Sequence, residues 1–115
     1  MATALTRLRL YGNAFGAGGA AALAPALTRL SRLEALCLSY NAIGAAGAAA
    51  LAPALGRLWA LSRLMLDHND VGDDGVQQLA PALARLPVLE RLDLCGNGLH
   101  YSAKGTLPAR VLVDF

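Results

Sequence analysis

The chain is poor in cysteine, in aromatic residues and in charge, and each scarcity narrows the kind of protein it can be. Its 115 residues include two cysteines, 5% aromatic and 16% charged side chains. Ten basic residues stand against eight acidic ones, with no run of lysines or arginines, so the composition lacks the footprint of a nucleic-acid-binding protein. We therefore expect no nucleic-acid partner.

The sequence also lacks a long uninterrupted hydrophobic run. Its most apolar stretch, residues 42–55, is broken by Gly44, Gly47 and Pro53 and is shorter than the roughly 20 residues that span a bilayer. The first residues carry Arg7 and Arg9 where a signal sequence needs an apolar core. We expect no membrane partner and a cytoplasmic location, with the 56% hydrophobic content forming one core.

The abundant feature is a repeat. The phrase Leu5-x-x-Leu8-x-Leu10-x-x-Asn13-x-Phe15 returns at a constant interval, as residues 33–43, 61–71 and 89–99. The second half of each unit repeats as well, at Leu23, Leu51, Leu79 and Leu107, and at Leu27, Leu55, Leu83 and Val111. A fixed frame that recurs four times is very improbable by chance. The sequence therefore predicts a single domain, 1–115, of four 28-residue units at about 5–32, 33–60, 61–88 and 89–115, each with two structural elements.

The LxxLxLxxN frame, followed by a stretch rich in glycine and alanine, resembles the ribonuclease-inhibitor-like class of leucine-rich repeats over residues 5–107. This resemblance implies an α/β fold, a right-handed αβ solenoid with a parallel sheet on its concave face and helices on its convex face. It also implies a non-catalytic module that binds a protein partner. The alternatives are a regulator of a partner enzyme, as in Ran GTPase-activating protein or the sensing ends of innate immune receptors, and an isolated repeat fragment without a selected partner.

Within a unit, Leu8-Arg9-Leu10 has the period of a half-buried strand, with the leucines facing the helices and residues 7, 9 and 11 facing out. Where the chain leaves the strand, a buried asparagine can satisfy the backbone groups of the turn. We predict a structural asparagine ladder of Asn13, Asn41, Asn69 and Asn97.

Helices of about 12 residues are expected to follow Gly16, Gly44 and Gly72. A second series of glycines, in the first turn of each helix, is expected to let helix and sheet backbones approach closely. That series is Gly19, Gly47 and Gly75.

The fourth unit departs from the pattern and reads as a degenerate terminal repeat. Residues 111–113 either finish a short helix or return as a capping strand, and the pattern favours neither. At the other end, the first strand offers an uncovered edge above Leu8 and Leu10. We therefore expect self-association, a homo-oligomer through the terminal repeats.

Several motifs imitate chemical sites, and each has a simpler explanation. Residues 16–21 imitate the G-x-G-x-x-A turn of dinucleotide-binding proteins, but the repeat itself accounts for the glycines. Residues 67–78 imitate a calcium loop, with Val71 and Gln78 where ligands should stand. Neither a zinc ligand set nor a Ser-His-acid triad emerges. We expect no metal, no cofactor and no enzymatic activity. Cys37 and Cys95, two strands apart, should be free thiols.

The repeat frame also stacks outward side chains in rows across the sheet. The rows are Arg7, Ala35, Arg63 and Arg91; then Arg9, Cys37, Met65 and Asp93; then Tyr11, Ser39, Asp67 and Cys95. Arginine, tyrosine and methionine are typical of interface cores. The predicted partner-binding residues on this face and its rim are Arg7, Arg9, Tyr11, Tyr40, Arg63, Asp67, His68, Arg91 and Asp93.

Arg63 and Arg91 are neighbours of like charge, which costs stability unless an acid lies nearby. Asp67 and Asp93 are the expected internal partners of these arginines. Trp59, in a helix-to-strand connection, is expected to cover an edge of the core.

Overall fold

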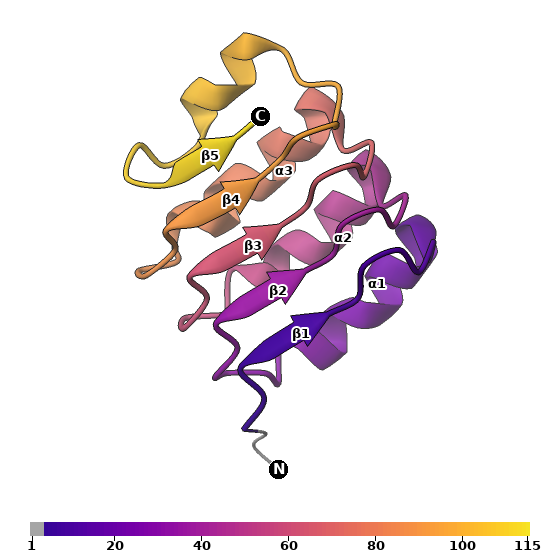
Figure 1. Cartoon of the computed structure of the whole chain (residues 1–115), viewed down its shortest axis with the longest axis vertical. Helices are drawn as coiled ribbons and strands as arrows, with labels where there is room; N and C mark the ends of the chain where they lie inside the picture. The colour runs from indigo at the N-terminus through magenta and orange to yellow at the C-terminus, as the bar shows by residue number, and fades with distance from the viewer. Residues whose placement is uncertain (1–3) are drawn as a thin grey trace.

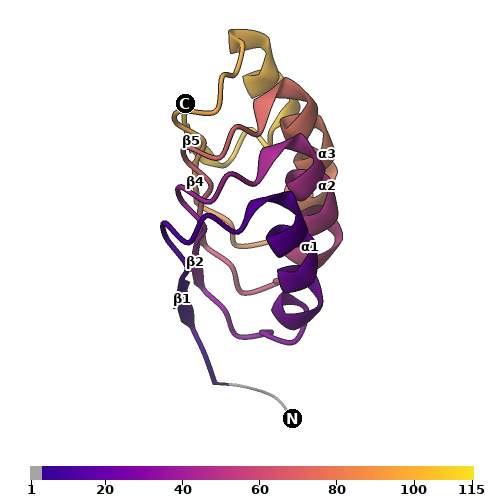
Figure 2. The same ribbon diagram turned by 90° about the vertical axis from the view of Figure 1, so that its right-hand side faces the viewer.

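Strands and helices alternate along the chain and form two layers. The computed structural model describes residues 4–115, without the side chains of residues 101 and 104. The elements in chain order are β1 (Arg7–Arg9), α1 (Gly16–Leu27), β2 (Ala35–Cys37), α2 (Gly44–Leu55), β3 (Arg63–Met65), α3 (Gly72–Ala84), β4 (Arg91–Asp93), the 3₁₀ helix η1 (Tyr101–Thr106) and β5 (Leu112–Asp114). Figure 1 shows the strands side by side in front of the helices, and Figure 2 shows the helices together on one side of the sheet.

The five strands form one parallel sheet in the order β1-β2-β3-β4-β5. From β1 to β4 each strand pairs with its equivalent in the next repeat unit, as in the register Leu8, Leu36, Leu64 and Leu92. The chain is therefore an αβ solenoid, which confirms the predicted fold class. No helix in the described part of the chain is long and apolar enough to cross a membrane.

The core lies between the sheet and the helices and is built from the repeated leucines. Leu36, Leu64 and Leu92, in the middle of their strands, are buried with 1%, 0% and 0% of their surface exposed. Their equivalent in β1, Leu8, is only partly buried, because no strand of the described chain covers the outer edge of β1. The exposed edge predicted for the first strand is confirmed for residues 4–115.

The asparagines form the predicted ladder where the chain leaves the sheet. Asn41, Asn69 and Asn97 are buried, and the Oδ1 atom of each accepts the backbone N–H of the equivalent asparagine in the preceding unit. The Nδ2 atom of each donates to carbonyl groups of its own turn and of the preceding unit. Asn13 is exposed, because no unit precedes it in the described chain. The ladder therefore links each unit to the next through side-chain hydrogen bonds to the backbone.

The glycines of the first helical turn act differently from the prediction. A Cβ atom on Gly47 would lie 2.6 Å from Cγ2 of Ile43 and 3.2 Å from Cα of Ala17, which belongs to α1. A Cβ on Gly75 would likewise meet Val71 and Ala45 of α2. The expected approach of helix and sheet backbones was wrong: these glycines let neighbouring helices approach each other and leave room for the residue before the helix.

The last unit ends in a strand, which decides between the two alternatives that the sequence left open. Leu112 of β5 pairs with Arg91 of β4. Fewer residues therefore separate the paired positions of β4 and β5 than separate those of β3 and β4. The short 3₁₀ helix η1 replaces the fourth α-helix, and the chain therefore returns to the sheet sooner. Leu107 and Val111 were aligned with helical leucines, and that alignment was wrong. Both side chains are buried but lie between η1 and β5.

Candidate protein-interaction surface

The outward side chains of the sheet form a surface that we call the strand face. It comprises the outward residues of β1 to β5 and the residues that follow each strand. The strand register aligns Arg7 with Ala35, Arg63 and Arg91, and Arg9 with Cys37, Met65 and Asp93, as the repeat frame predicts. The predicted site residues therefore lie on one continuous surface.

The arginines of the strand face differ in their ionic contacts. The Arg91 guanidinium lies 3.5 Å from a carboxylate oxygen of Asp114 in β5, with both side chains about half exposed. Among the described residues, no carboxylate lies within ion-pair distance of Arg7, Arg9 or Arg63. These three exposed guanidinium groups keep their charge available to a ligand.

The expected pairing of the arginines with Asp67 and Asp93 was wrong. Asp67 accepts a hydrogen bond from the Ser39 hydroxyl at 2.5 Å and lies 3.3 Å from Nδ1 of His68. Asp93 accepts the backbone N–H of Cys95. The sequence did not predict Ser39 as the partner of Asp67, nor Asp114 as the partner of Arg91. Asp114 could not be assigned because the pattern left the last segment undecided between helix and strand.

Ser39, Asp67 and His68 come together, but in an order that does not activate the hydroxyl. The carboxylate of Asp67 lies between the hydroxyl and the imidazole and accepts a hydrogen bond from Ser39. In a nucleophilic triad the imidazole takes the proton from the hydroxyl and the acid orients the imidazole. Ser39 is also buried, with 3% of its surface exposed. The group instead orients His68 at the rim of the sheet.

An aromatic row occupies that rim. The Tyr40 and His68 rings are stacked, with centroids 4.3 Å apart and an interplanar angle of 7°. The Tyr11 ring meets Tyr40 edge to face at 5.4 Å. We call Tyr11, Tyr40 and His68 the aromatic rim. Both tyrosines are well exposed, at 63% and 47%.

The backbone beneath the aromatic rim has an unusual conformation. Tyr40 and His68 have φ values of 58° and 56°, in the left-handed region. The equivalent residues of the first and fourth units are Gly12 and Gly96, with φ values of 69° and 70°. A side chain in this region costs roughly 1–2 kcal/mol, whereas glycine has no such cost. The two central units therefore carry rings where the backbone favours glycine.

The two cysteines are free thiols in polar surroundings. The Cys37 sulfur lies 3.4 Å from the Ser39 hydroxyl oxygen. A hydrogen bond to Asp93 favours the neutral thiol of Cys95 and raises its pKa, and burial and the charges of Asp93, Asp114 and Asp67 act in the same direction. Acidic residues thus collect around Cys95, at or beyond the ends of β3, β4 and β5.

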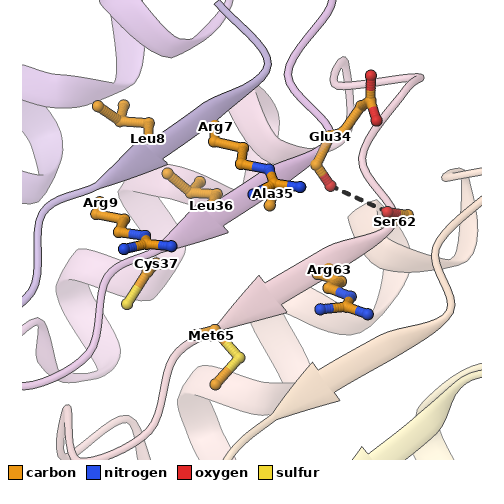
Figure 3. A pocket seen from close by; sticks show the side chains of 10 residues that line it. All are labelled: Arg7, Leu8, Arg9, Glu34, Ala35, Leu36, Cys37, Ser62, Arg63 and Met65. Atoms are coloured by element: carbon orange, nitrogen blue, oxygen red, sulfur yellow. Dashed lines mark hydrogen bonds between the residues drawn. The ribbon is translucent and has the colours of Figure 1, made fainter.

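A hollow of about 480 Å³ lies on the arginine side of the strand face. Its lining includes Arg7, Arg9 and Arg63 around Ala35 and Cys37 of β2. Figure 3 shows the Arg7 and Arg9 side chains extending from β1 over β2. The hollow exists because Ala35 stands in a row otherwise formed by arginines. The sequence placed Ala35 in that row but did not predict the hollow.

Trp59 is 49% exposed, so it covers the core edge only in part. Its ring faces the Arg85 guanidinium at 5.8 Å, within the range of a cation–π contact. Trp59 and Arg85 lie between helix and strand, outside the strand face.

The loop that imitates a calcium site does not bring its acids together. Asp67 contacts Ser39 and His68, whereas Asp73 contacts His100 through Nδ1 at 2.6 Å and through the backbone N–H at 2.9 Å. The described residues include no cluster of three or more histidine, cysteine or acidic side chains that could hold a metal ion. Asp73 instead contacts the residue directly before η1.

A sequence model of the Leucine Rich repeat family matches residues 3–24, 31–52 and 61–80, more than half of the chain. The chain belongs to the leucine-rich repeat family. A search of curated proteins found no significant match. Among solved structures, the chain is similar to "Leiomodin-1 Actin-Binding Site 2 (ABS2)", with a TM-score of 0.70 and 17% sequence identity. That similarity covers 90% of this chain and 76% of the other chain, and it supports the leucine-rich repeat fold.

Proposed function

We propose that this leucine-rich repeat protein is a non-catalytic interaction module that binds a protein partner through the strand face and the aromatic rim. The contact residues are Arg7, Arg9, Tyr11, Tyr40, Arg63, Asp67, His68, Arg91 and Asp93. We further propose that it belongs to the ribonuclease-inhibitor-like class, on the basis of the length and frame of its repeat units, and that it works in the cytoplasm.

The observation that carries the proposal is the aromatic rim on left-handed backbone. Local backbone strain persists where the surrounding structure holds it, and it concentrates at functional sites. Exposed tyrosines also supply a large contact area at a low cost in conformational entropy. Tyr40 and His68 combine the two features, because each is strained, exposed and stacked on the other.

The solved relative supports protein binding as the kind of function. Its title names an actin-binding site, so a chain of this fold is associated with a protein ligand. At 17% identity the relative does not suggest the identity of the partner of this chain.

The test replaces Tyr40 by glycine and uses Ala42→Gly as its matched control. Tyr40 and Ala42 both have left-handed backbone, at φ 58° and 54°, so both substitutions relieve the same kind of strain. Only Tyr40→Gly removes a ring from the rim. Proteins retained from a lysate by the wild type and by Ala42→Gly, but not by Tyr40→Gly, are identified by mass spectrometry.

Each retained protein is then purified and titrated against the three variants by calorimetry. We expect a stoichiometric complex that Ala42→Gly preserves and Tyr40→Gly weakens by about 1–3 kcal/mol, the range of an aromatic interface residue. Partners that bind Tyr40→Gly as tightly as the wild type would contradict the role of the rim.

We also propose that the chain self-associates through its first unit. The outer edge of β1 is unpaired in the described sheet, and Leu8 and Leu10 beneath it are only partly buried. Within the described chain, Oδ1 of Asn13 has no donor, whereas Oδ1 of Asn41 accepts the N–H of Asn13. A second copy would cover this edge and these leucines.

A further inference from the structure

The unpaired arginines define a chemical preference for the partner. We propose that the hollow above Ala35 binds an acidic segment of a protein partner, in extended conformation, whose carboxylates pair with Arg7, Arg9 and Arg63. This inference rests on the proposed function and adds the class of ligand and its position on the strand face.

The first support is charge. Three guanidinium groups line the hollow. Among the described lining residues, Glu34 supplies the acidic side chain. Figure 3 shows the Glu34 carboxylate pointing away from the guanidinium groups, and no ion pair joins it to an arginine among the described residues. The hollow therefore presents an excess of positive charge, although the whole chain has a net charge of only +2.

The second support is the contrast with the other side of the strand face. Arg91 is already paired with Asp114, and Asp93 is aligned with Asp114 in the register of β4 and β5, whereas Asp67 follows β3. The acids thus lie at or beyond the ends of β3 to β5, whereas the free arginines lie on β1 and at the start of β3. An acidic segment is attracted to the hollow and repelled by the remainder of the face, which fixes its position.

The third support is spacing. Arg7 and Arg9 alternate on one strand, so their Cα atoms lie about 7 Å apart, and the Cα atom of Arg63, two strands away, lies about 10 Å from that of Arg7. Alternate side chains of an extended peptide have the same period of about 7 Å. Guanidinium groups can also hold carboxylates through two parallel hydrogen bonds. A peptide with acids at alternate positions therefore matches Arg7 and Arg9, and Arg63 faces it from across β2.

The fourth support is shape. Ala35 leaves room between Arg7 and Arg63 in the register of β1, β2 and β3. Cys37 and Met65, at outward positions of β2 and β3, also line the hollow and add apolar surface for the stems of a bound side chain. A site with a defined floor and charged walls differs from a diffuse positive patch.

The test uses a fluorescent peptide of alternating glutamate and serine, with the glutamine version as its neutral control. Binding to the full chain is measured by anisotropy at about 50 mM and about 200 mM salt, where screening differs clearly. We expect the glutamate peptide to bind and to weaken with salt, since the contacts are ionic. Equal affinity for the two peptides, or no binding at the lower salt concentration, would overturn the inference.

Variants then separate the hollow from general attraction. Arg63→Gln should lower the affinity for the peptide about two- to fivefold, and replacing all three arginines by glutamine should lower it roughly 10- to 100-fold. Arg57→Gln removes the same charge from an exposed position outside the strand face and should have little effect. Ala35→Leu changes no charge but fills the hollow, so it should weaken binding as clearly as Arg63→Gln does.

Two results would count against the hollow as the site. One is an equal loss in Arg57→Gln and Arg63→Gln, and the other is unchanged affinity in Ala35→Leu. The inference can also fail while the proposed function holds. A protein partner that depends on Tyr40 but binds the triple arginine variant as tightly as the wild type would show that outcome.

Discussion

The asparagine ladder predicts a large difference in stability between two chemically identical substitutions. Asn69 is fully buried, and its Oδ1 atom accepts the backbone N–H groups of Asn41 at 2.8 Å and Ile43 at 3.4 Å. Its Nδ2 atom donates to the carbonyl groups of Leu38, Leu66 and Asp67. Asn69→Ala removes all five contacts at once.

The loss is largest at the backbone donors. Each of the three carbonyls keeps a second partner: Nδ2 of Asn41 for Leu38, Nδ2 of Asn97 for Leu66 and the N–H of Tyr40 for Asp67. No other acceptor is found in the described chain for the N–H groups of Asn41 and Ile43. A buried polar group that is left without a hydrogen-bond partner costs about 1–3 kcal/mol. A group that loses one of two hydrogen bonds costs less. We expect Asn69→Ala to lower the free energy of unfolding by about 3–5 kcal/mol.

Asn13→Ala is the matched control. Asn13 is exposed, and its Nδ2 atom donates only to the carbonyls of Leu10 and Tyr11, where water can replace it. We expect a loss of about 0.5–1 kcal/mol. A chain of this length has a total stability of about 6–17 kcal/mol, so Asn69→Ala removes a large share of it.

Equilibrium unfolding in urea measures the difference. Circular dichroism reports on the helices, and the fluorescence of Trp59, the one tryptophan in the sequence, gives an independent probe of two-state behaviour. With a slope of about 1–3 kcal/mol per molar, Asn69→Ala should lower the midpoint by roughly 2 M relative to the wild type. Equal losses in Asn69→Ala and Asn13→Ala would refute the reasoning, because the ladder would then not stabilise the turns through burial.

Three further predictions concern packing, the last unit and assembly. Gly47→Ala should destabilise the fold by about 1–3 kcal/mol in the same urea assay, because its Cβ would lie 2.6 Å from Cγ2 of Ile43. Gly18→Ala is the control and should be neutral or stabilising, because its Cβ would meet no atom within 4 Å. The backbone N–H and then the imidazole of His100 stabilise the Asp73 carboxylate and lower its pKa, so this contact adds stability above the usual carboxyl range and loses it as pH falls through the lowered pKa. Asp73→Ala should therefore lower the melting temperature at pH 7 more than Asp74→Ala does, with the difference shrinking as pH falls through the lowered pKa of Asp73. Light scattering on a sizing column should give a molar mass that rises with concentration above the 11.9 kDa of one chain, and a constant monomer mass would contradict self-association.

The repeated features of this chain could be predicted from the sequence because each has a fixed position in the repeat frame. Leu36, Leu64 and Leu92 have equal surroundings, so their burial follows from the frame alone. The same holds for the rows of the strand face, since parallel strands in constant register align equivalent residues. Asn41 and Asn69 likewise make equivalent hydrogen bonds.

The features that break the frame could not be predicted in this way. The fifth strand pairs with the fourth after a shorter stretch of chain than the frame prescribes, because a 3₁₀ helix spans fewer residues than the α-helix it replaces. Asp114 therefore reaches Arg91, a contact that the constant interval of the repeat does not anticipate. The role of Gly47 was also misjudged, because the repeat gives its position in the helix but not the neighbour it faces.

The departures from the frame also identify the candidate site. Ala35 interrupts a row of arginines and leaves the hollow, and Tyr40 and His68 replace glycines where the backbone is left-handed. The backbone does not favour the second change, since glycine fits the left-handed position without strain. Both departures alter only exposed or partly exposed surface on one side of the sheet. In a fold built from equivalent units, a specific surface arises at the residues that depart from the repeat pattern. We therefore expect the partner to contact the units that contain Ala35, Tyr40 and His68.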